Sequence, residues 1–577
     1  MTIFKANPLG ASRGKHKVVQ LFFCLAEMPK AQRSQIDRLQ LGLIVKEKIL
    51  KKYGYSRIYK KLLHDLRMLE TGIEIGSPPR LVKCGVLLQV ADNLEAHEVG
   101  GFSTCFSSKS VCRWCHIQYG ELQSRIHDFA GLESHGRWTV DEYDAIVSKL
   151  VRKESVRQLP DTDDDLETAD VTNDNVIDDL EYELSTSSSE GDESGREDDE
   201  NAETFGLRMR CPFNELQTFH SVTSFVPDVM HDLMEGVIPQ DLLGVIRILS
   251  LKGWFSIENY NKMLGKICSD SRDRPHDIPG KSAKKLVGKA VSHWVHIRSF
   301  GMIIKDFVVD LSDSVLALGL KLVQITERIT ASKFRLHEID ILEEKILEYL
   351  DCRKVIFEEY PFMLGSAKPK HHYMVHYAES IRAFGPPLVY WTARYESKHR
   401  IAKNTAENAK NFINISATLA ERQQLRMASV YYEGMFQTKN VVLPVKILHG
   451  SDVPSESKFQ KKLKEFISGS DIVCDEIQVK NQMYRKKDLL VIGVVDRFAL
   501  EVGIISDNIL KNEEVYFACK VFQAVRNDLE YFSSGLVLAE VRFVHADSLI
   551  DYKPLKIRGS LLKFVFSLHH HISFSFD

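Results

Sequence analysis

A long acidic tract constrains the fold more than any other feature, because it cannot form part of a folded core. Between Asp161 and Glu203 the chain has 19 acidic residues and one basic residue, Arg196. The surrounding stretch is poor in aromatic residues and rich in Asp, Glu, Ser and Thr, which bury too little apolar area to offset the entropy of ordering the chain. We therefore predict a disordered loop over residues 159–206, with folded regions on both sides.

The charge balance changes when this tract is set aside. The chain has 76 Lys and Arg and 79 Asp and Glu residues, a formal net charge of −3. Outside the tract 75 basic residues face 60 acidic ones, a net charge of +15. A basic folded part is expected of a protein that binds nucleic acid. One hypothesis is that the acidic tract competes with DNA for this basic face; the alternative is a solvated insertion with no role of its own.

The sequence carries no sign of membrane insertion or secretion. No apolar run approaches the roughly 20 residues needed to span a bilayer. Residues 1–17 lack the apolar core and cleavage site of a signal peptide. The ten cysteines are scattered over 577 residues, which does not suit a disulfide framework. We predict a soluble intracellular protein with no membrane partner, and leave homo-oligomer formation open.

The N-terminal part has the order expected of half an α/β core. The apolar run from His16 to Met28 predicts a core strand, and the apolar spacing from Ser34 to Leu69 predicts one or two helices. A second buried strand is predicted from Val82 to Val90, because this run is short, mostly apolar and bounded by polar residues. Asp92 would then lie just past the end of a strand.

The remaining chain shows two further patterns. From Val226 to Glu358 apolar residues recur mostly at steps of three and four, which predicts helices. Beyond about Tyr432 the pattern changes to short segments rich in β-branched residues, separated by polar turns. This second pattern predicts a small β-barrel or sandwich.

A basic segment surrounds Glu396. On a helix Glu396, His399 and Lys403 would share one face at positions i, i+3 and i+7. Several cations there could contact DNA phosphates, a sequence-independent and salt-sensitive contribution to binding; they are Arg394, Lys398, His399, Arg400 and Lys403. A second phosphate-binding surface is predicted just upstream, with a solvated helix face as the alternative; it comprises Lys368, Lys370, His371, His372, Tyr373, His376 and Tyr377.

Cys112 and Cys115 form a CxxC pair that could supply half of a zinc site, because two thiolates one turn apart can bind one Zn²⁺. Two further ligands are needed. We favour Cys211 among the nearby candidates, which are His116, His127, His135, Cys211 and His220. The alternative is a pair of buried structural thiols without metal.

Asp228 and His231 form an Asp-x-x-His motif. At i and i+3 of a helix the two side chains lie on one face and could hydrogen bond, which would orient a site or its DNA. The alternative is a helix start, because a carboxylate is favoured near a helix N-terminus.

Several of these motifs, in this order, resemble the animal branch of the CACTA (En/Spm-like) transposases. They are Asn7-Pro8-Leu9-Gly10, Gly14 to Lys17, Ala91-Asp92-Asn93-Leu94, the CxxC segment, Asp228 to Pro239, Lys368 to Tyr377 and Arg394 to Asn404. The similarity covers roughly residues 5 to 430. It implies an RNase H-like core interrupted by a large, mostly helical insertion. Together with the patterns above, the predicted fold class is α/β, with a C-terminal β-rich domain. The resemblance also implies a nuclear enzyme of DNA recombination that acts on the ends of a mobile element.

The resemblance implies catalytic roles for Asp92 and Glu396, with Asp228 and His231 as accessory residues. Phosphodiester cleavage and strand transfer would use two Mg²⁺ or Mn²⁺ ions about 4 Å apart, held by clustered carboxylates. The family's first catalytic Asp lies just before the Asn7-Pro8 turn, where residues 1–6 contain no acid. The resemblance therefore implies an N-terminally truncated transposase that is inactive as given. The alternative is a non-catalytic DNA- or protein-binding module that retains the fold.

These expectations divide the chain into six parts. The first part of the RNase H-like core spans residues 1–116, and its completion with the Glu396 helix spans 366–430. The other four parts are a cysteine- and histidine-bearing segment at 117–158, the acidic loop at 159–206, the helical insertion at 207–365 and the β-rich domain at 431–577.

Overall fold

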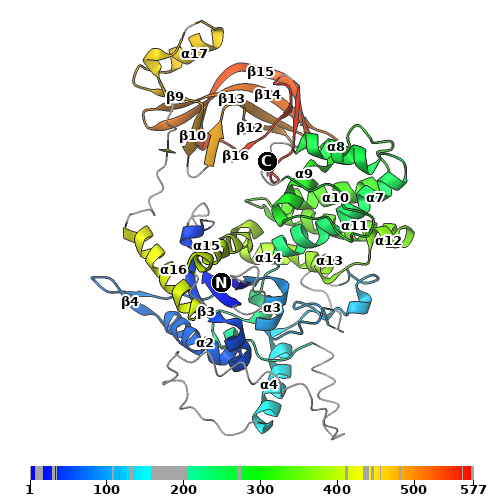
Figure 1. The fold of residues 1–577 in the computed structure, drawn as a ribbon, viewed down its shortest axis with the longest axis vertical. Coiled ribbons are helices and arrows are strands. Elements are labelled where there is room, and N and C mark those ends of the chain that lie inside the picture. The colour runs from blue at the N-terminus through cyan, green and yellow to red at the C-terminus, as the bar shows by residue number, and fades with distance from the viewer. Residues whose placement is uncertain are drawn as a thin grey trace. The chain divides into compact units, whose positions relative to one another are not determined.

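The computed structural model describes most of the chain (Figure 1). The described residues are 2–6, 17–28, 33, 35–106, 110–126, 128, 136–157, 206–268, 274–409, 413–432, 441–442, 447–454, 456–479, 482–561 and 563–572. The disordered loop predicted over residues 159–206 lies outside them except for Gly206, and so does the Asn7-Pro8-Leu9-Gly10 motif. None of the described helices has both the length and the apolar character needed to cross a membrane.

The chain folds into two compact units, each built from separate segments. The first unit comprises Met1–Asp232, Ala367–Phe384 and Val389–Glu433. The second comprises Leu233–Ser366, Gly385–Leu388 and Gly434–Asp577. This division differs from the predicted domains in two respects. Residues 207–232 belong to the first unit, and the C-terminal β-rich part forms one unit with the helices.

A four-stranded mixed sheet organises the first unit. In sequence order its strands are β1 (Thr2–Ala6), β2 (Val18–Phe23), β3 (Gln40–Lys46) and β6 (Val90–Ala91). In space the order is β3-β2-β1-β6. β2 runs antiparallel to both β1 and β3, whereas β6 runs parallel to β1. The prediction of a core strand after His16 is confirmed by β2, in which Val18, Val19 and Leu21 are fully buried.

The prediction of helices over residues 34–69 is only partly right. Residues 40–46 form strand β3, and the helix α2 (Glu47–Thr71) begins after it. The branched side chains of Ile44 and Val45 suit a strand, and Val45 pairs with Val19 of β2. A short apolar segment can match both periods, so its spacing alone does not separate helix from strand.

The predicted strand over Val82–Val90 is much shorter than expected. β4 (Ile73–Ile75) and β5 (Arg80–Val82) form an exposed hairpin, and only Val90–Ala91 joins the sheet. Between them the backbone N–H of Val86 donates to Thr218 Oγ1 at 3.0 Å, so a side chain takes the place of a partner strand. The prediction that Asp92 directly follows a strand is confirmed.

Helices surround the sheet of the first unit. Two of them, α15 and α16, pack against β2 and β3 through Val18, Ala406, Ile415 and Leu419. The helical elements of this unit are η1 (Ile36–Arg38), α2, α3 (Asn93–Gly100), η2 (Tyr119–Glu121), α4 (Val140–Arg157), η5 (Pro212–Glu215), α6 (Ser221–Ser224), α13 (Pro369–Tyr373), η7 (Met374–His376), α14 (Tyr377–Phe384), α15 (Ala393–Ala409) and α16 (Ile415–Tyr432).

The second unit begins with the helices predicted from the sequence pattern. They are η6 (Met230–Val237), a π-helix that starts in the first unit, α7 (Ile238–Leu251), α8 (Ile257–Ile267), α9 (Ala290–Ile304), α10 (Ser314–Ile329), α11 (Leu336–Glu359), α12 (Pro361–Leu364) and the short η8 (Pro387–Val389). Their apolar faces are buried, as in α7, where Leu242, Val245 and Leu249 are fully inaccessible. Because the chain returns to the first unit at Ala367, this helical segment is an insertion into that unit.

The C-terminal part is β-rich, as predicted. Its largest sheet is built on the long strands β13 and β14. Arg526 at the end of β14 pairs with Glu327 of α10 at 2.8 Å, which joins this sheet to the helices of the same unit. The elements are β7 (Val441–Val442), β8 (Leu448–His449), η9 (Gly450–Asp452), α17 (Lys458–Phe466), β9 (Ile472–Cys474), β10 (Glu476–Val479), β11 (Gln482–Arg485), β12 (Leu489–Asp496), β13 (Ala499–Lys511), β14 (Glu514–Arg526), β15 (Phe532–His545), η10 (Ala546–Ser548), β16 (Asp551–Leu555), β17 (Arg558–Gly559) and β18 (Phe564–Phe566).

Candidate functional site

A buried group of two cysteines and two histidines lies in the first unit. Cys112 and Cys115 come from the loop after α3, His372 from α13 and His376 from η7. Each of the four residues is at most 1 % exposed, and their ligand atoms all lie within 4.8 Å of one another. This group could hold a metal ion such as zinc.

The distances within the group suit tetrahedral coordination. Cys112 Sγ lies 3.4 Å from His376 Nε2, Cys115 Sγ lies 3.1 Å from His372 Nε2, and the two Nε2 atoms are 3.1 Å apart. In a tetrahedral Zn²⁺ site with Zn–S of about 2.3 Å and Zn–N of about 2.0 Å, the ligand atoms are separated by roughly 3.3–3.8 Å. The side chains are therefore already close to the geometry that the ion requires.

Neighbouring groups orient these ligands. His372 Nδ1 lies 3.1 Å from the carbonyl oxygen of Ile126, a contact that directs Nε2 toward the cysteines. The backbone N–H of Trp114 donates to Cys112 Sγ at 3.4 Å. Burial lowers the pKa of His376 to about 3, so its imidazole is neutral, as a metal ligand must be.

The expectation that Cys211 is a zinc ligand is wrong. Cys211 packs in the core beside Leu21 and Tyr59, and burial raises the pKa of its thiol to about 12. Of the other candidates, His116 pairs with Glu142 and His220 lies near Asp144. His127 and His135 lie outside the described residues.

The prediction that His372 and His376 belong to a phosphate-binding surface is also wrong. The aromatic members of the predicted surface are buried, including Tyr373 and Tyr377. Their spacing in the sequence could have identified these two histidines as metal ligands, because a His-x-x-x-His pair is the usual complement of a CxxC pair in a zinc site. Here 257 residues separate Cys115 from His372, and only the fold brings them together.

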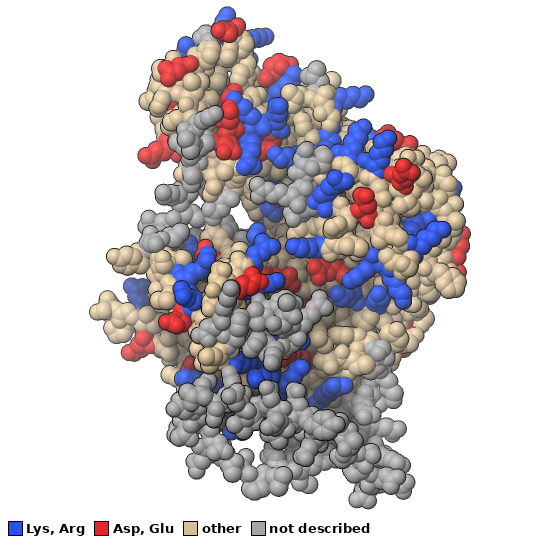
Figure 2. Space-filling view, in the orientation of Figure 1, with Lys and Arg blue, Asp and Glu red and all other residues tan. Residues whose placement is uncertain are grey.

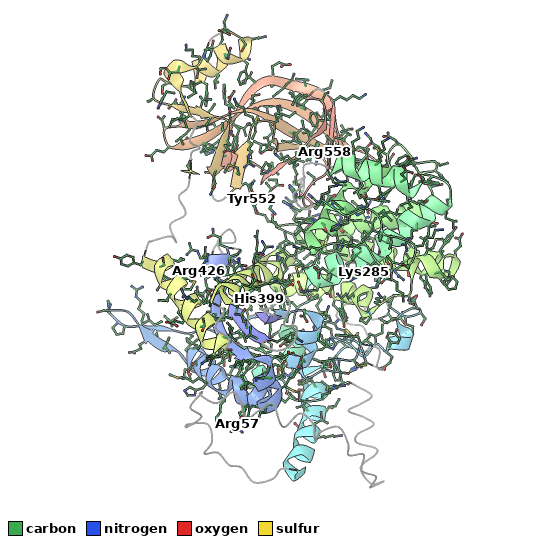
Figure 3. The ribbon with its side chains drawn as sticks, in the orientation of Figure 1. Arg57, Lys285, His399, Arg426, Tyr552 and Arg558 are labelled. Carbon is green, nitrogen blue, oxygen red and sulfur yellow. The ribbon has the colours of Figure 1, made fainter. Side chains whose placement is uncertain are left out.

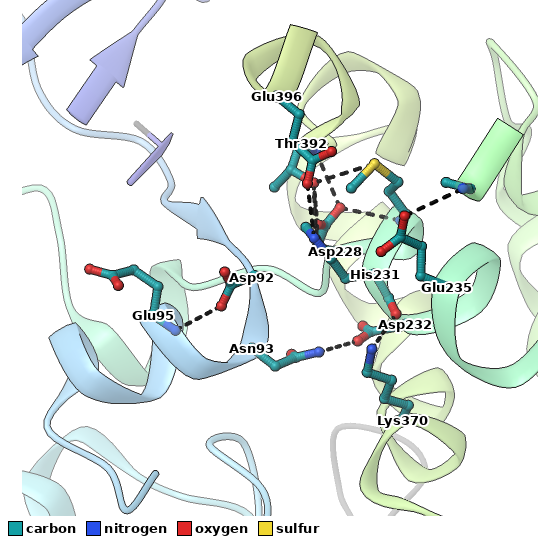
Figure 4. Close-up of polar contacts among 12 residues, drawn as sticks. Asp92, Asn93, Glu95, Asp228, His231, Asp232, Glu235, Lys370, Thr392 and Glu396 are labelled. Atoms are coloured by element: carbon teal, nitrogen blue, oxygen red, sulfur yellow. Dashed lines mark hydrogen bonds and ion pairs between the residues drawn. The ribbon is translucent and has the colours of Figure 1, made fainter. Parts of the chain in front are cut away.

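Asp92 has a clear structural role. It is the N-cap of α3, and its Oδ1 accepts a hydrogen bond from the backbone N–H of Glu95 at 2.9 Å (Figure 4). Such caps stabilise a helix by about 1 kcal/mol. The second carboxylate oxygen makes no contact with the other predicted site residues that Figure 4 draws.

Asp228 and His231 form the contact that their spacing predicts. Asp228 Oδ2 lies 2.5 Å from His231 Nδ1, and the Asp228 side chain is fully buried. Thr392 also holds this carboxylate, because its hydroxyl donates to Oδ2 and its backbone N–H donates to Oδ1. Burial alone would raise the pKa of Asp228, but the charge of His231 and these hydrogen bonds outweigh it and lower the pKa.

Glu396 completes a three-residue chain. His231 Nε2 lies 3.0 Å from Glu396 Oε1, so the imidazole bridges the carboxylates of Asp228 and Glu396. Burial opposes protonation of His231, but the two carboxylates prevail and raise its pKa well above 6.5. Near neutral pH the bridge is therefore an imidazolium between two carboxylates. The Glu396 side chain is 43 % exposed, so this end of the chain faces solvent.

A buried hydrogen-bonded connection runs from the cysteine loop toward these residues. Arg113 is fully buried, stacks 3.7 Å above the Trp114 ring and donates to Asn93 Oδ1 at 2.9 Å. Asn93 in turn donates to Asp232 Oδ1 at 2.5 Å (Figure 4). Asn93 follows Asp92 in the chain, and Asp232 follows His231. The connection therefore joins the side chains next to these two predicted site residues. Burial raises the pKa of Asp232 to about 6.

The predicted magnesium cage is not assembled. Among the residues that the structure describes, the Cys₂His₂ group is the only set of three or more potential ligands that lie within metal-binding distance. Asp92 and Glu396 belong to no such set. The residues present therefore do not fit a two-metal centre of Mg²⁺ or Mn²⁺.

The basic residues of α15 differ in accessibility. Arg394, Arg400 and Lys403 are exposed. Lys398 is 1 % exposed and donates to the carbonyl of Ile36 at 3.0 Å, and burial lowers the pKa of its ammonium to about 8. The prediction that Lys398 contacts phosphate is therefore corrected, because its side chain faces the interior.

The structure also describes three other residues that were predicted to contact DNA. His399, labelled in Figure 3, packs edge-on against Phe22 with 5.7 Å between ring centroids. Burial lowers the pKa of His399 to about 4, so it is no phosphate-binding cation at neutral pH. Lys368 is exposed. Lys370 is half-buried and donates to the carbonyl of His231 at 2.7 Å.

Comparisons with known proteins do not assign the chain to a family. No protein-family model matches the chain, and no curated protein matches it.

Proposed function

We propose that the first unit is the RNase H-like core of a DDE-type cut-and-paste DNA transposase, with an incomplete set of catalytic acids. The observation that carries this proposal is the sheet order β3-β2-β1-β6, with Asp92 at the end of the parallel strand β6. A mixed sheet of this kind, with a carboxylate at the end of its parallel strand, is what an RNase H-like core requires.

The position of the helical insertion supports the same proposal. The resemblance implies an insertion between the second Asp and the Glu. Leu233–Ser366 interrupts the first unit after the Asp-x-x-His motif and before α15, which carries Glu396. The insertion therefore lies where a transposase of this type would have it.

In this proposal the imidazolium of His231 is a positioning group. It holds Glu396 on the solvent-facing side of α15, while Asp228 and Thr392 fix the imidazole from behind. Asp92 follows the parallel strand β6 and caps α3. The acid set is one short, because β1 (Thr2–Ala6) contains no carboxylate.

We assign the Cys₂His₂ group a structural role, with Zn²⁺ as the ion that fits its donor set. Two thiolates and two imidazoles fill four tetrahedral positions and leave no open position for a substrate. The bound ion would cross-link the loop after α3 to α13 and η7. It would supply stability and take no part in the reaction.

The register of β1 suggests a direct test. Thr2 pairs with Val90 and Ile3 pairs with Ala91, so Phe4 follows the paired residues of β1 as Asp92 follows those of β6. A Phe4→Asp substitution would add an acid at this position of β1. The measurement is nicking of supercoiled plasmid and strand transfer, with Mg²⁺ or Mn²⁺.

We expect the unmodified chain to be inactive and Phe4→Asp to gain activity. Phe4→Asn is the matched control, since it has the same shape without the charge. Glu396→Gln in the Phe4→Asp background should abolish the gain. A folded Phe4→Asp protein without activity would contradict the enzyme proposal. If it still binds DNA, the alternative of a non-catalytic DNA-binding module would stand.

A further inference from the structure

An irregular segment of the second unit, residues 274–289, is held in place by an arginine from a neighbouring helix. Arg247 of α7 donates through Nη1 to the carbonyl of Ala283 at 2.8 Å, and through Nη2 to the carbonyls of Gly280 at 2.6 Å and Pro279 at 3.3 Å. One guanidinium thus binds three backbone oxygens of a segment that has no helix or strand of its own.

Two further anchors hold the segment at either side. The backbone N–H of Ile278 donates to Asn261 Oδ1 at 2.9 Å, and that of Leu286 donates to the carbonyl of Pro239 at 2.7 Å. The side chains of Ile278 and Leu286 are buried, at 8 % and 3 % exposed. The backbone of the segment is therefore held at both of these positions as well as by Arg247.

The segment 274–289 is rich in basic residues and poor in acids. The segment 274–289 contains five Lys and Arg residues and a single acid, Asp277. We call these five cations the basic platform; they are Arg274, Lys281, Lys284, Lys285 and Lys289. All five are exposed. Within the described parts of the chain none of them takes part in an ion pair, whereas Lys252 and Lys321 of the same unit do. Figure 3 labels Lys285, and Figure 2 shows Lys and Arg side chains gathered around that position.

We infer that the basic platform is a binding surface for the phosphate backbone of duplex DNA. Each of these five exposed cations can replace a condensed counterion on the duplex, which favours binding through counterion release. The three-carbonyl clamp of Arg247 reduces the ordering cost on binding, since the backbone is already fixed. Contacts to the phosphate backbone contribute affinity and position but carry no sequence information. This inference deepens the proposed function and rests on it for the biological source of the DNA.

The test is binding of the full chain to a fluorescein-labelled 30-base-pair duplex, followed by anisotropy at 50–300 mM NaCl without divalent metal. The five phosphate contacts of the platform would contribute about −4.5 to the slope of log affinity against log salt, at about 0.9 per contact. The variant Lys281→Gln/Lys284→Gln/Lys285→Gln should bind at least about 20-fold more weakly at 100 mM salt and have a slope smaller by about 2.7. The matched control is Lys458→Gln/Lys461→Gln/Lys462→Gln on α17, which removes the same charge from lysines elsewhere in the unit and should bind like the unmodified chain.

Arg247→Met tests the clamp without touching the platform. It should weaken binding by several-fold while the salt slope changes by less than about one contact. Equal loss in the platform and α17 triple variants would mean that only net charge matters, and would overturn the assignment. Unchanged binding by the platform variant, or tighter binding of an acidic polypeptide or single-stranded RNA than of the duplex, would also overturn it. Because no metal is present, these results do not depend on the nicking assay: a lack of activity would contradict only the enzyme proposal.

Discussion

The first unit contains two clusters of chemically active side chains that differ in completeness. The Cys₂His₂ group is closed: four ligand atoms converge in the interior, and each residue is at most 1 % exposed. The carboxylate chain of Asp228, His231 and Glu396 is open, because one end is buried and the other is 43 % exposed. A closed set of four ligands is typical of a structural metal site. The comparison teaches that one fold can keep its structural site intact while its proposed catalytic site lacks an acid.

Removal of a ligand from the closed site should have the largest effect. We expect the purified chain to contain about one zinc per molecule, and Cys115→Ser to lose it. The free energy of unfolding should fall by about 4 kcal/mol or more, because metal binding and folding are coupled. Metal content by mass spectrometry and urea unfolding would measure both effects.

Cys211→Ser is the control for this experiment. Cys211 is equally buried but lies in the core beside Leu21 and Tyr59, away from the group. It should lose some stability and keep its zinc. Zinc loss in this variant, or full zinc content in Cys115→Ser, would contradict the assignment of the ligands.

The open site should show a smaller effect that depends on pH. His231→Asn removes the imidazolium, and we expect a loss of about 2–3 kcal/mol near pH 6. The folded pKa of His231 is raised above 6.5, so its contribution is complete below pH 6.5 and is lost as the pH rises through the raised value. The pKa of Asp228 is lowered, so its contribution is complete above pH 3.8 and is lost at more acid pH. Urea unfolding of both proteins from pH 3 to pH 9 should show the gap widest between these limits.

Thr392→Val gives the comparison for that series. It removes one hydroxyl donor to Asp228 and leaves the charges in place. We expect a loss of about 1 kcal/mol that varies little above pH 6. A pH-independent gap for His231→Asn would mean that the imidazole is neutral in the folded protein.

The smallest effects concern the cations of α15. Arg400→Gln and Lys403→Gln should each weaken DNA binding by a few-fold and reduce the salt slope by about one contact. Lys398→Met should leave DNA binding unchanged, because this side chain is buried. Because burial lowers the pKa of Lys398 to about 8, the charged lysine destabilises the fold fully below about pH 8, and this effect fades as the pH rises toward 10.5. At pH 7 the Met variant should therefore be more stable by about 1 kcal/mol. Weaker DNA binding by Lys398→Met would show that this lysine contacts phosphate after all.

Local spacing in the sequence predicts the parts of the site that depend on near neighbours. The contact of Asp228 with His231 follows from three positions along a helix. The place of Asp92 follows from the apolar run that ends at Val90. The C-terminal strands are predicted from short segments rich in β-branched residues, because the residue pattern within each segment indicates a strand without reference to its neighbours.

The errors concern partners distant in the chain. Nothing near Cys112 indicates that His376 will approach it, because the helical insertion and the acidic tract lie between them in sequence. The exposure of Lys398 depends on which face of α15 packs against the sheet, and a helix rich in charge on all sides does not reveal that face. Strand β3 is not predicted because its seven residues suit either period until β2 lies beside them.

The Cys₂His₂ group also affects how the chain tolerates change in length. A bound ion would close a loop of 257 residues between Cys115 and His372, in the manner of a disulfide staple. The entropy of closing such a loop grows only with the logarithm of its length, by about 0.6 kcal/mol for each doubling. Once the staple is in place, residues can be added between its two halves at little thermodynamic cost. The first unit can thus host a large insertion in the middle of its chain and still retain a single core.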